Sequence, residues 1–361
     1  MVNFINIYHE KAYMGVWGNI GIFKNIVLST FLSTPYKINF AVTALCNSRC
    51  KTCNAWKLKK DPSNELKTWE IDAFFKSLPN TVTWLSLTGG EPFLRNDLSK
   101  IIHSAIKNIR SLKVITIPSN GLLKDRVLDV LKNTPDFLIF MNFSIDGPRK
   151  IHDFIRGIDG GFDKTWDTYL AVLELSKKRK NLKVGIETTV SSYNINHLDA
   201  FLTDLVKSGH NTTLTFAQEG ILYSNFGMKG IISRNSIMIK RLINIVNRNL
   251  KIYDPLHFVE KKYLKNVIPY IERKSSGFRP KKCVAVASSL SIDSLGRVYP
   301  CLVWGKEIGI LRDINYNIIN LDKERIRAVR KMINGRECPN CWTPCEAYQS
   351  IIMDTLKLNW R

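Results

Sequence analysis

The fold and its chemistry are both indicated by the octapeptide Cys46-Asn47-Ser48-Arg49-Cys50-Lys51-Thr52-Cys53. It follows the apolar run 38–43, whose β-branched and aromatic residues predict a buried strand. Three thiols therefore lie on one short loop at the end of a strand. A [4Fe–4S] cluster needs a ligand on each of its four irons, so this loop would leave one iron open. An open position is typical of a catalytic metal site, and a structural zinc completed by a distant residue is the alternative.

Outward from this loop, β-rich runs alternate with helical patterns, as in a parallel α/β sheet or barrel. The predicted strands are 38–43, 83–87, 113–117, 137–144, 183–190 and 212–217. The predicted helices between them are 68–78, 98–109, 125–131, 163–178 and 197–207. These six units are two short of a closed eight-stranded barrel, so we expect an α/β fold with a partial (β/α)6 TIM-like barrel. Chemistry in such folds lies at the C-terminal strand ends, where the cysteine loop falls.

The spacing of Cys46, Cys50 and Cys53 resembles the CxxxCxxC loop of the radical S-adenosylmethionine (SAM) superfamily. In that family SAM chelates the open iron, and its reductive cleavage gives a 5′-deoxyadenosyl radical that abstracts hydrogen from the substrate. The resemblance implies an oxygen-sensitive enzyme that needs a reductant such as ferredoxin or flavodoxin. The family usually has an aromatic residue next to the adenine where this chain has Thr52, and Trp56 is the candidate replacement.

Polar motifs at the next strand ends resemble the SAM-binding motifs of the same family. Thr88-Gly89-Gly90-Glu91-Pro92 matches GGEP, in which glycines allow close backbone approach and the carboxylate accepts hydrogen bonds from the SAM ammonium. A tight turn is the alternative for the glycines. The SAM contacts that the resemblance implies are Gly89, Gly90, Glu91, Ser119, Asn120, Ser144, Asp146 and Arg156. We expect Glu91 to contribute little to the core, and capping is the alternative role for Asp146.

The other five cysteines all lie in the last quarter of the chain: Cys283, Cys301, Cys338, Cys341 and Cys345. Their pattern resembles the SPASM and shorter twitch modules of radical SAM enzymes, which carry auxiliary [4Fe–4S] clusters. Four of the five thiols would bind one such cluster. A zinc ribbon built from Cys283, Cys301, Cys338 and Cys341 is the alternative.

These patterns divide the chain into four parts. They are an N-terminal extension (1–36), a radical SAM barrel (37–230), a helical connection (231–279) that begins with a helix over 236–252, and a SPASM/twitch-like module (280–361). We detect no signal peptide and no apolar run long enough to span a bilayer, so we expect a cytoplasmic protein with reduced thiols.

The chain carries 53 Lys and Arg against 31 Asp and Glu, a net charge of +22. This charge would attract an anionic partner, and a solvated basic surface is the alternative. Apolar residues at helical spacing between Ile22 and Phe31 predict a helix that packs on the fold or lies at an anionic membrane surface.

The resemblance implies peptide or protein modification with redox help from the auxiliary cluster, although it identifies no catalytic acid or base. Sulfatase maturation is disfavoured because Leu302, and not an acidic residue, follows Cys301. Radical modification of a lipid, sugar or alcohol is the alternative. A basic metal-binding protein that binds nucleic acid is the non-enzymatic alternative, but it leaves the ordered series of motifs unexplained.

Overall fold

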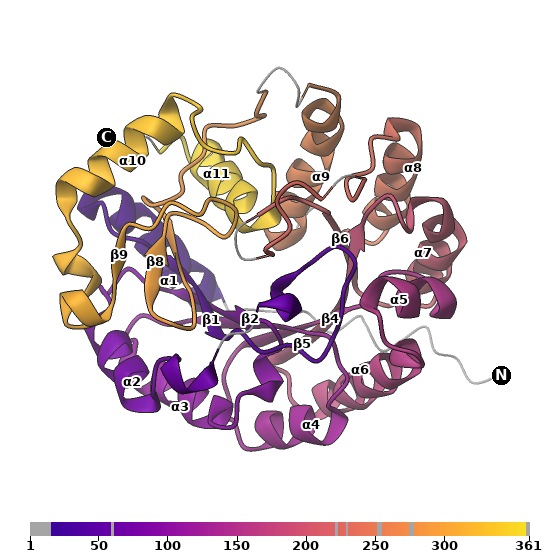
Figure 1. Ribbon diagram of the computed structural model, residues 1–361, viewed down its shortest axis with the longest axis horizontal. Coiled ribbons are helices and arrows are strands. Elements are labelled where there is room, and N and C mark those ends of the chain that lie inside the picture. The colour runs from indigo at the N-terminus through magenta and orange to yellow at the C-terminus, as the bar shows by residue number, and fades with distance from the viewer. Residues whose placement is uncertain are drawn as a thin grey trace.

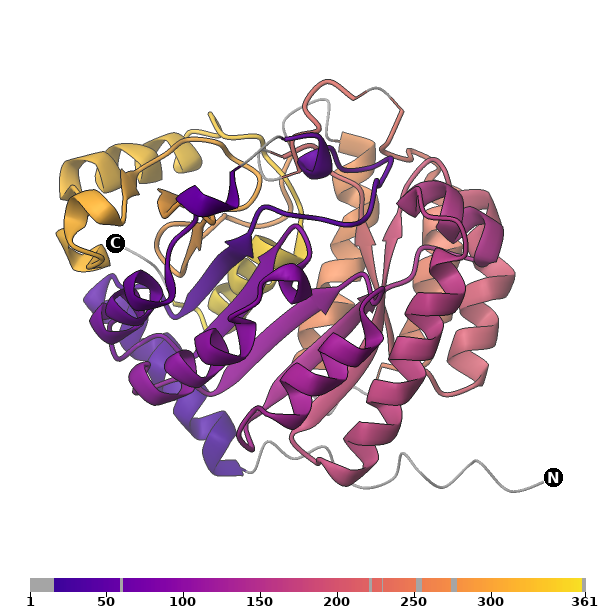
Figure 2. The ribbon, with the colours of Figure 1, turned by 60° about the horizontal axis from the view of Figure 1, so that its bottom comes forward.

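The computed structural model describes residues 16–58, 61–220, 223–228, 230–250, 255–273 and 278–358. Within them, nine strands form one sheet in the order β6-β5-β4-β3-β2-β1-β7-β8-β9. Helices form an outer ring around the strands in Figure 1, and Figure 2 shows the strands from the side. The sheet and the surrounding helices make an open α/β barrel.

Six consecutive parallel strands build the barrel wall. They are β1 (Lys37–Thr43), β2 (Trp84–Gly89), β3 (Val114–Ser119), β4 (Ile139–Ser144), β5 (Leu182–Val190) and β6 (Thr212–Phe216). The helices between them include α2 (Thr68–Ser77), α3 (Leu98–Asn108), α4 (Lys124–Lys132), α6 (Gly161–Lys178) and α7 (Leu198–Lys207). The predicted partial (β/α)6 barrel is thus confirmed.

Side chains alternate between the two faces of these strands. Met141 and Phe143 of β4 are fully buried, and the Phe143 ring packs against Tyr169 of α6. Asn142 and Ser144, which point the other way, line an interior cavity of about 3000 Å³. The period of two along a strand therefore places apolar side chains under the helices and polar ones inside the barrel.

The C-terminal cysteine region continues the barrel sheet. β7 (Ser289–Ile292) pairs in parallel with β1, and β8 (Arg297–Tyr299) and β9 (Gly309–Ile310) follow antiparallel to each other. Two helices, α10 (Lys323–Asn334) and α11 (Pro344–Thr355), complete the region. The sheet crosses the predicted boundary at residue 280, and that boundary stays a prediction.

The sequence analysis gave no bounds for four helices. They are α5 (Arg149–Arg156), which follows β4, α9 (Pro255–Arg273), which lies in the predicted helical connection, and α10 and α11 of the C-terminal region. The helix predicted over 236–252 is α8, which ends at Asn247. Short 3-10 helices are Ala55–Lys57, Pro62–Asn64, Pro92–Leu94, Ile195–His197, Arg312–Ile314 and Ile318–Asn320.

The N-terminal extension contains α1 (Val16–Leu32), and residues 1–15 lie outside the described part. Ile26 is buried and packs against Met353 of α11, whereas Phe23 and Phe31 are exposed. The apolar stripe therefore packs on the fold in part. Among the described residues we find no helix with the length and hydropathy needed to cross a membrane.

Candidate active site

The three cysteines of the first loop lie at the C-terminal end of β1, and all three line the interior cavity. Each sulfur has a hydrogen-bond donor from another residue next to it. The donors are Ser48 N to Cys46 Sγ at 3.4 Å, Arg156 Nη1 to Cys50 Sγ at 3.8 Å and Ala55 N to Cys53 Sγ at 3.5 Å. Burial raises the pKa of Cys46 to about 12 and that of Cys53 to about 11. Metal binding deprotonates such thiols, and the three donors stabilise the resulting thiolates.

This donor set fits a [4Fe–4S] cluster with three protein ligands. Cys46, Cys50 and Cys53 would hold the cluster, and its open iron would supply the electron that cleaves bound SAM. In the parts of the chain that the structure describes, no three His, Cys, Asp or Glu side chains converge on the position of a single metal ion. A cubane does not require such convergence, because each thiolate binds a different iron.

Backbone hydrogen bonds hold the cysteine loop from two sides. On one side lies the C-terminal end of α5. Arg49 N donates to Arg156 O and Lys51 N donates to Ile155 O, both at 2.8 Å. Gly157 follows with φ +63°, and a Cβ there would lie 2.7 Å from Arg49 O. Any other residue would thus be both strained and in collision with the loop.

The segment after β6 holds the opposite side of this loop. Asn54 N donates to Tyr223 O at 2.7 Å, and Asn225 Nδ2 donates to Thr52 O at 2.9 Å. The loop is therefore fixed between two segments that are far from it in sequence.

The glycines of the GGEP motif pack directly on the start of the cysteine loop. A Cβ on Gly89 would lie 2.1 Å from Thr43 O, and one on Gly90 would lie 2.0 Å from Leu45 O. Gly90 N donates to Thr43 O at 2.9 Å, and Glu91 N donates to Leu45 O at 2.7 Å. Their lack of a side chain lets two strand ends approach each other.

Glu91 ties the end of β2 to the end of β3. Its carboxylate accepts hydrogen bonds from Ser119 Oγ at 2.9 Å, Asn120 N at 2.7 Å and Phe93 N at 3.3 Å. The residue is 2% exposed, and burial raises its pKa to about 7 against the effect of these donors. The expectation that Glu91 contributes little to the core is wrong, because three buried donors depend on it.

Asn120 links β3 to the cysteine loop. Its Nδ2 donates to Asn47 Oδ1 at 2.7 Å and to Ser48 Oγ at 2.9 Å. Through Glu91 and Asn120, the second and third strand ends support the loop that carries the thiols.

Asp146 acts on the site through Arg156. Its Oδ2 lies 2.8 Å from Arg156 Nε, and its Oδ1 accepts a hydrogen bond from Thr189 N at 3.0 Å. Although burial opposes the charge, Asp146 and Cys50 raise the pKa of Arg156 above its ordinary value. Asp146 therefore holds a guanidinium beside Cys50.

Seven of the eight residues predicted to contact SAM line the same cavity as the three thiols. The eighth, Asp146, is buried behind Arg156. Their contacts with SAM stay predictions. Trp56 also lines the cavity, and its Nε1 donates to Cys50 O at 3.3 Å. The proposed replacement for the missing aromatic residue is thus next to the loop, and its adenine contact stays a prediction as well.

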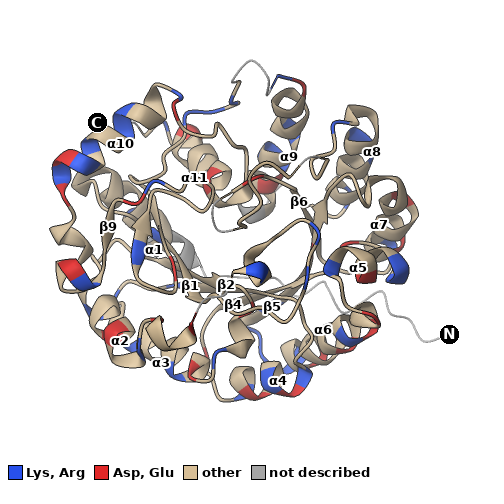
Figure 3. Cartoon of the chain, in the orientation of Figure 1, with Lys and Arg blue, Asp and Glu red and all other residues tan. Residues whose placement is uncertain are grey.

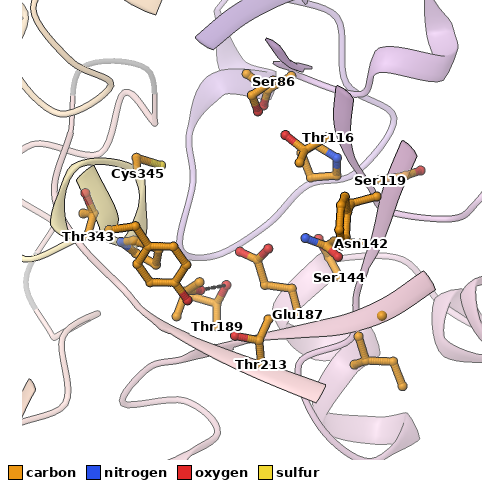
Figure 4. A pocket seen from close by; sticks show the side chains of 18 of the residues that line it. Ser86, Thr116, Ser119, Asn142, Ser144, Glu187, Thr189, Thr213, Thr343 and Cys345 are labelled. Atoms are coloured by element: carbon orange, nitrogen blue, oxygen red, sulfur yellow. Dashed lines mark hydrogen bonds between the residues drawn. The ribbon is translucent and has the colours of Figure 1, made fainter. Parts of the chain in front are cut away.

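Hydrogen-bond donors distinguish four of the five C-terminal cysteines. Ala285 N donates to Cys283 and Thr343 N donates to Cys341. Trp304 N lies 3.3 Å from Cys301 Sγ, and Arg279 Nη1 lies 3.5 Å from Cys338 Sγ. Cys345 alone among the five lines the interior cavity, where Figure 4 shows it with Thr343 across from Glu187. Burial raises the pKa of Cys345 to about 12 against the positive charge of Lys37.

Sequence reasoning missed most of the charged residues of the cavity, among them Glu187 and Lys37. A signal for Glu187 was present, because it is the one acidic residue in the six strand sequences. An acidic residue at an inward position of a buried strand indicates a polar site. Lys37 stands at the first position of β1, where a strand boundary is hard to assign.

Residues 40–205 match the sequence profile of the radical SAM superfamily. The chain is 26% identical over 273 residues to Fe-coproporphyrin III synthase of Methanosarcina barkeri, a match that spans 73% of this chain and 65% of that protein. It is 26% identical over 283 residues to GTP 3′,8-cyclase of Alkaliphilus oremlandii, across 76% of this chain and 84% of that protein. The first match therefore covers slightly less than two thirds of the relative.

Two solved structures share the fold. Native anSMEcpe with bound AdoMet and Cp18Cys peptide superposes with a TM-score of 0.55 at 17% identity, over 90% of this chain and 96% of that one. Streptococcus suis SuiB bound to precursor peptide SuiA superposes with a TM-score of 0.56 at 13% identity, over 91% of this chain and 74% of that one. At these identities the likeness concerns the architecture.

Proposed function

We propose that this protein is a radical SAM enzyme that works with a [4Fe–4S] cluster and SAM, as the match of residues 40–205 to that superfamily supports. We further propose that it abstracts hydrogen from a peptide or protein substrate. The observation that carries this proposal is the cavity itself. It begins at Cys46, Cys50 and Cys53, passes through the barrel interior and reaches Cys345 of the C-terminal region. A substrate in it would face the SAM-cleaving loop on one side and the second cysteine group on the other.

The peptide assignment is supported by the two structural relatives, which share the fold across most of their length and were solved with peptides bound. The cavity also has room for such a ligand. At about 3000 Å³ it is several times larger than the ~300–1000 Å³ typical of small-molecule sites, and the cluster, SAM and the substrate would share this space.

We further propose that Cys283, Cys301, Cys338 and Cys341 hold the auxiliary cluster. Each has a donor beside its sulfur, as the three cysteines of the first loop do. Cys345 would be the spare thiol, because it turns toward the cavity instead. The auxiliary cluster would supply a redox partner next to the substrate.

The test uses anaerobically reconstituted full-length protein with dithionite and SAM. An extract of the source cells is separated into a peptide fraction and a small-molecule fraction, and 5′-deoxyadenosine is measured with each. We expect the peptide fraction to raise 5′-deoxyadenosine above the level without substrate and to show a SAM-dependent mass shift. The triple variant Cys46→Ala, Cys50→Ala, Cys53→Ala is the control and should form none.

Modification of a small molecule is the second candidate, favoured by the names of the curated relatives, a porphyrin synthase and a nucleotide cyclase. If the small-molecule fraction alone stimulates 5′-deoxyadenosine formation, this candidate replaces the first.

A further inference from the structure

Polar side chains on the inner faces of the six parallel strands line a chamber inside the barrel. Those with hydroxyl or amide groups are Ser86, Thr88, Thr116, Asn142, Ser144, Thr189, Thr213 and Thr215. Figure 4 shows most of them arranged around the same space. Such groups bind polar ligand atoms, whereas an acyl chain is bound by apolar side chains. These groups suit a polar part of a substrate, and apolar side chains such as Phe140, Ile186 and Phe216 line other parts of the same cavity.

Several charged residues stand among these neutral groups; Glu260 accepts a hydrogen bond from Thr213, and Glu187 and Lys37 lie on the strands themselves. The carboxylate of Glu187 projects into the chamber from β5, where the Asn142 side chain donates a hydrogen bond to it. Lys37, on β1, is 5% exposed and lines the same cavity. Its Nζ lies 4.4 Å from the centre of the Trp84 ring and 3.5 Å from Cys345 O.

These two charges act on each other without forming an ion pair. Each contributes electrostatically to the ionisation of the other, although Arg156 acts more strongly on Glu187, and Cys345 and Glu346 act more strongly on Lys37. In the described part of the chain no ion pair within 4.0 Å joins Lys37 to Glu187. An ammonium has three donors and an ionised carboxylate accepts about four hydrogen bonds, so both groups keep unused capacity. Burial also lowers the pKa of Lys37 and raises that of Glu187. A ligand that supplied the opposite charge to each would offset the cost of burying both.

We infer that Lys37 and Glu187 bind a zwitterionic, amino-acid-like unit of the substrate, with its carboxylate at Lys37 and its ammonium at Glu187. This inference rests on the proposed function, since it takes the chamber as part of the substrate site. It narrows that function to substrates that present both charges close together, such as a peptide that ends in lysine, whose C-terminal carboxylate and side-chain ammonium belong to one residue. SAM also carries an ammonium and a carboxylate, so SAM is the competing occupant.

The experiment measures the binding of three probes with the same carbon skeleton. They are 5-aminopentanoate, which carries both charges, and pentanoate and 1-aminopentane, which carry one each. Saturation-transfer NMR on the full-length protein with both clusters, saturating SAM and no reductant gives the three dissociation constants. We expect 5-aminopentanoate to bind at least tenfold more tightly than either control. Equal binding of the three probes overturns the inference. So does 5-aminopentanoate that binds in the absence of SAM but not in its presence.

Variants then assign each charge to its residue. Lys37→Met should bring 5-aminopentanoate down to the affinity of 1-aminopentane, and Glu187→Gln should bring it down to the affinity of pentanoate. Lys183→Met is the matched control, because Lys183 is the other lysine on these strands and lines the same cavity; it should leave the ranking unchanged. Lys37→Arg, which keeps the charge, should preserve it too. An unchanged ranking in Lys37→Met or Glu187→Gln contradicts the assignment.

This measurement needs no turnover, so its outcome is separate from that of the 5′-deoxyadenosine test. Wild-type protein alone gives the probe ranking, and the inference can therefore fail even if a variant does not fold.

Discussion

At the scale of single residues, Glu91 combines a place in a SAM-binding motif with a structural role. We predict that Glu91→Ala lowers the free energy of unfolding of the apo protein by about 2 kcal/mol, because Ser119 Oγ and Asn120 N lose their buried acceptor. Anaerobic urea unfolding measures this loss. Asp61→Ala is the control, since Asp61 accepts hydrogen bonds from Ser63 alone at an exposed site; a loss equal to that of the control would contradict the prediction.

Cys345 allows a second prediction at this scale. We expect the reconstituted wild type to bind about eight irons, four per cubane, and Cys345→Ala to keep all of them, because this thiol faces the cavity. Cys341→Ala should lower the count to about four. Iron and acid-labile sulfide analysis distinguishes the two variants. A count of four in Cys345→Ala would make that residue a ligand, and stoichiometric zinc would favour the ribbon alternative.

At the scale of elements, the contact between α5 and the cysteine loop depends on one glycine. We predict that Gly157→Ala destabilises the loop by more than about 1 kcal/mol, with loss of the SAM-cleaving cluster, because the new Cβ would lie 2.7 Å from Arg49 O. Iron content and 5′-deoxyadenosine formation are the readouts. Gly160→Ala is a matched control, since Gly160 has nearly the same φ of +67° but no atom within 4 Å of its Cβ position. Equal effects of the two changes would show that the collision is unimportant.

The barrel strands could be predicted to within one or two residues, since each is a short run of β-branched, aromatic and other apolar residues bounded by polar turns. α5 was missed because its eight residues, many of them charged, are too few for a helical apolar period to show. The bounds of α9 within the helical connection were not predicted, because its lysines and Pro269 are typical of a linker and its apolar side is defined by packing against α11. The thiols were found from their spacing, but the hydrogen bonds that separate Cys345 from the other four exist only in the folded chain.

At the scale of the whole molecule, Glu70 of α2 joins the barrel to the C-terminal region. Its carboxylate accepts hydrogen bonds from Arg312 Nε at 2.7 Å, Tyr316 OH at 2.9 Å and Lys67 N at 2.7 Å. Burial opposes its ionisation, but these donors lower its pKa to about 2.

Because the pKa of Glu70 is lower in the folded state than in the unfolded state, its carboxylate stabilises the fold fully at pH values above the unfolded pKa, near 4.5. This stabilisation is lost as the pH falls from 4.5 toward 2. We predict that Glu70→Gln lowers the free energy of unfolding by about 2 kcal/mol at pH 7. The difference in unfolding free energy between wild type and variant should narrow steadily below pH 4.5. Urea unfolding of the apo protein between pH 7 and 3 measures both. Glu174→Gln, at an exposed pair with Lys177, should cost little at any pH, and a constant gap for Glu70→Gln would contradict the linkage.

The charge of the whole molecule motivates a last prediction. Figure 3 shows Lys and Arg on many of the outer helices, and Phe23, Phe31 and Leu32 are exposed on α1. We predict sedimentation with vesicles that contain anionic lipid, since each lysine near such a surface contributes about 1 kcal/mol, and weaker binding as salt rises.

The double variant Phe23→Glu, Phe31→Glu should release the protein from these vesicles. Ile237→Glu, on the exposed side of α8, should not. If the wild type stays in the supernatant, the charge serves another purpose.

The pairing of β1 with β7 has a consequence for the synthesis of the chain. β1 is buried along its whole length between β2 and β7, yet Asn39 and its partner Ser291 are 252 residues apart. At about 10 residues per second the ribosome needs roughly 25 seconds to deliver the second partner. During that time the strand that leads into the cysteine loop has one open edge of unpaired backbone N–H and C=O groups, the kind of surface that pairs with other chains. The nascent barrel is therefore a natural client for chaperones, and premature termination before β7 should yield insoluble protein.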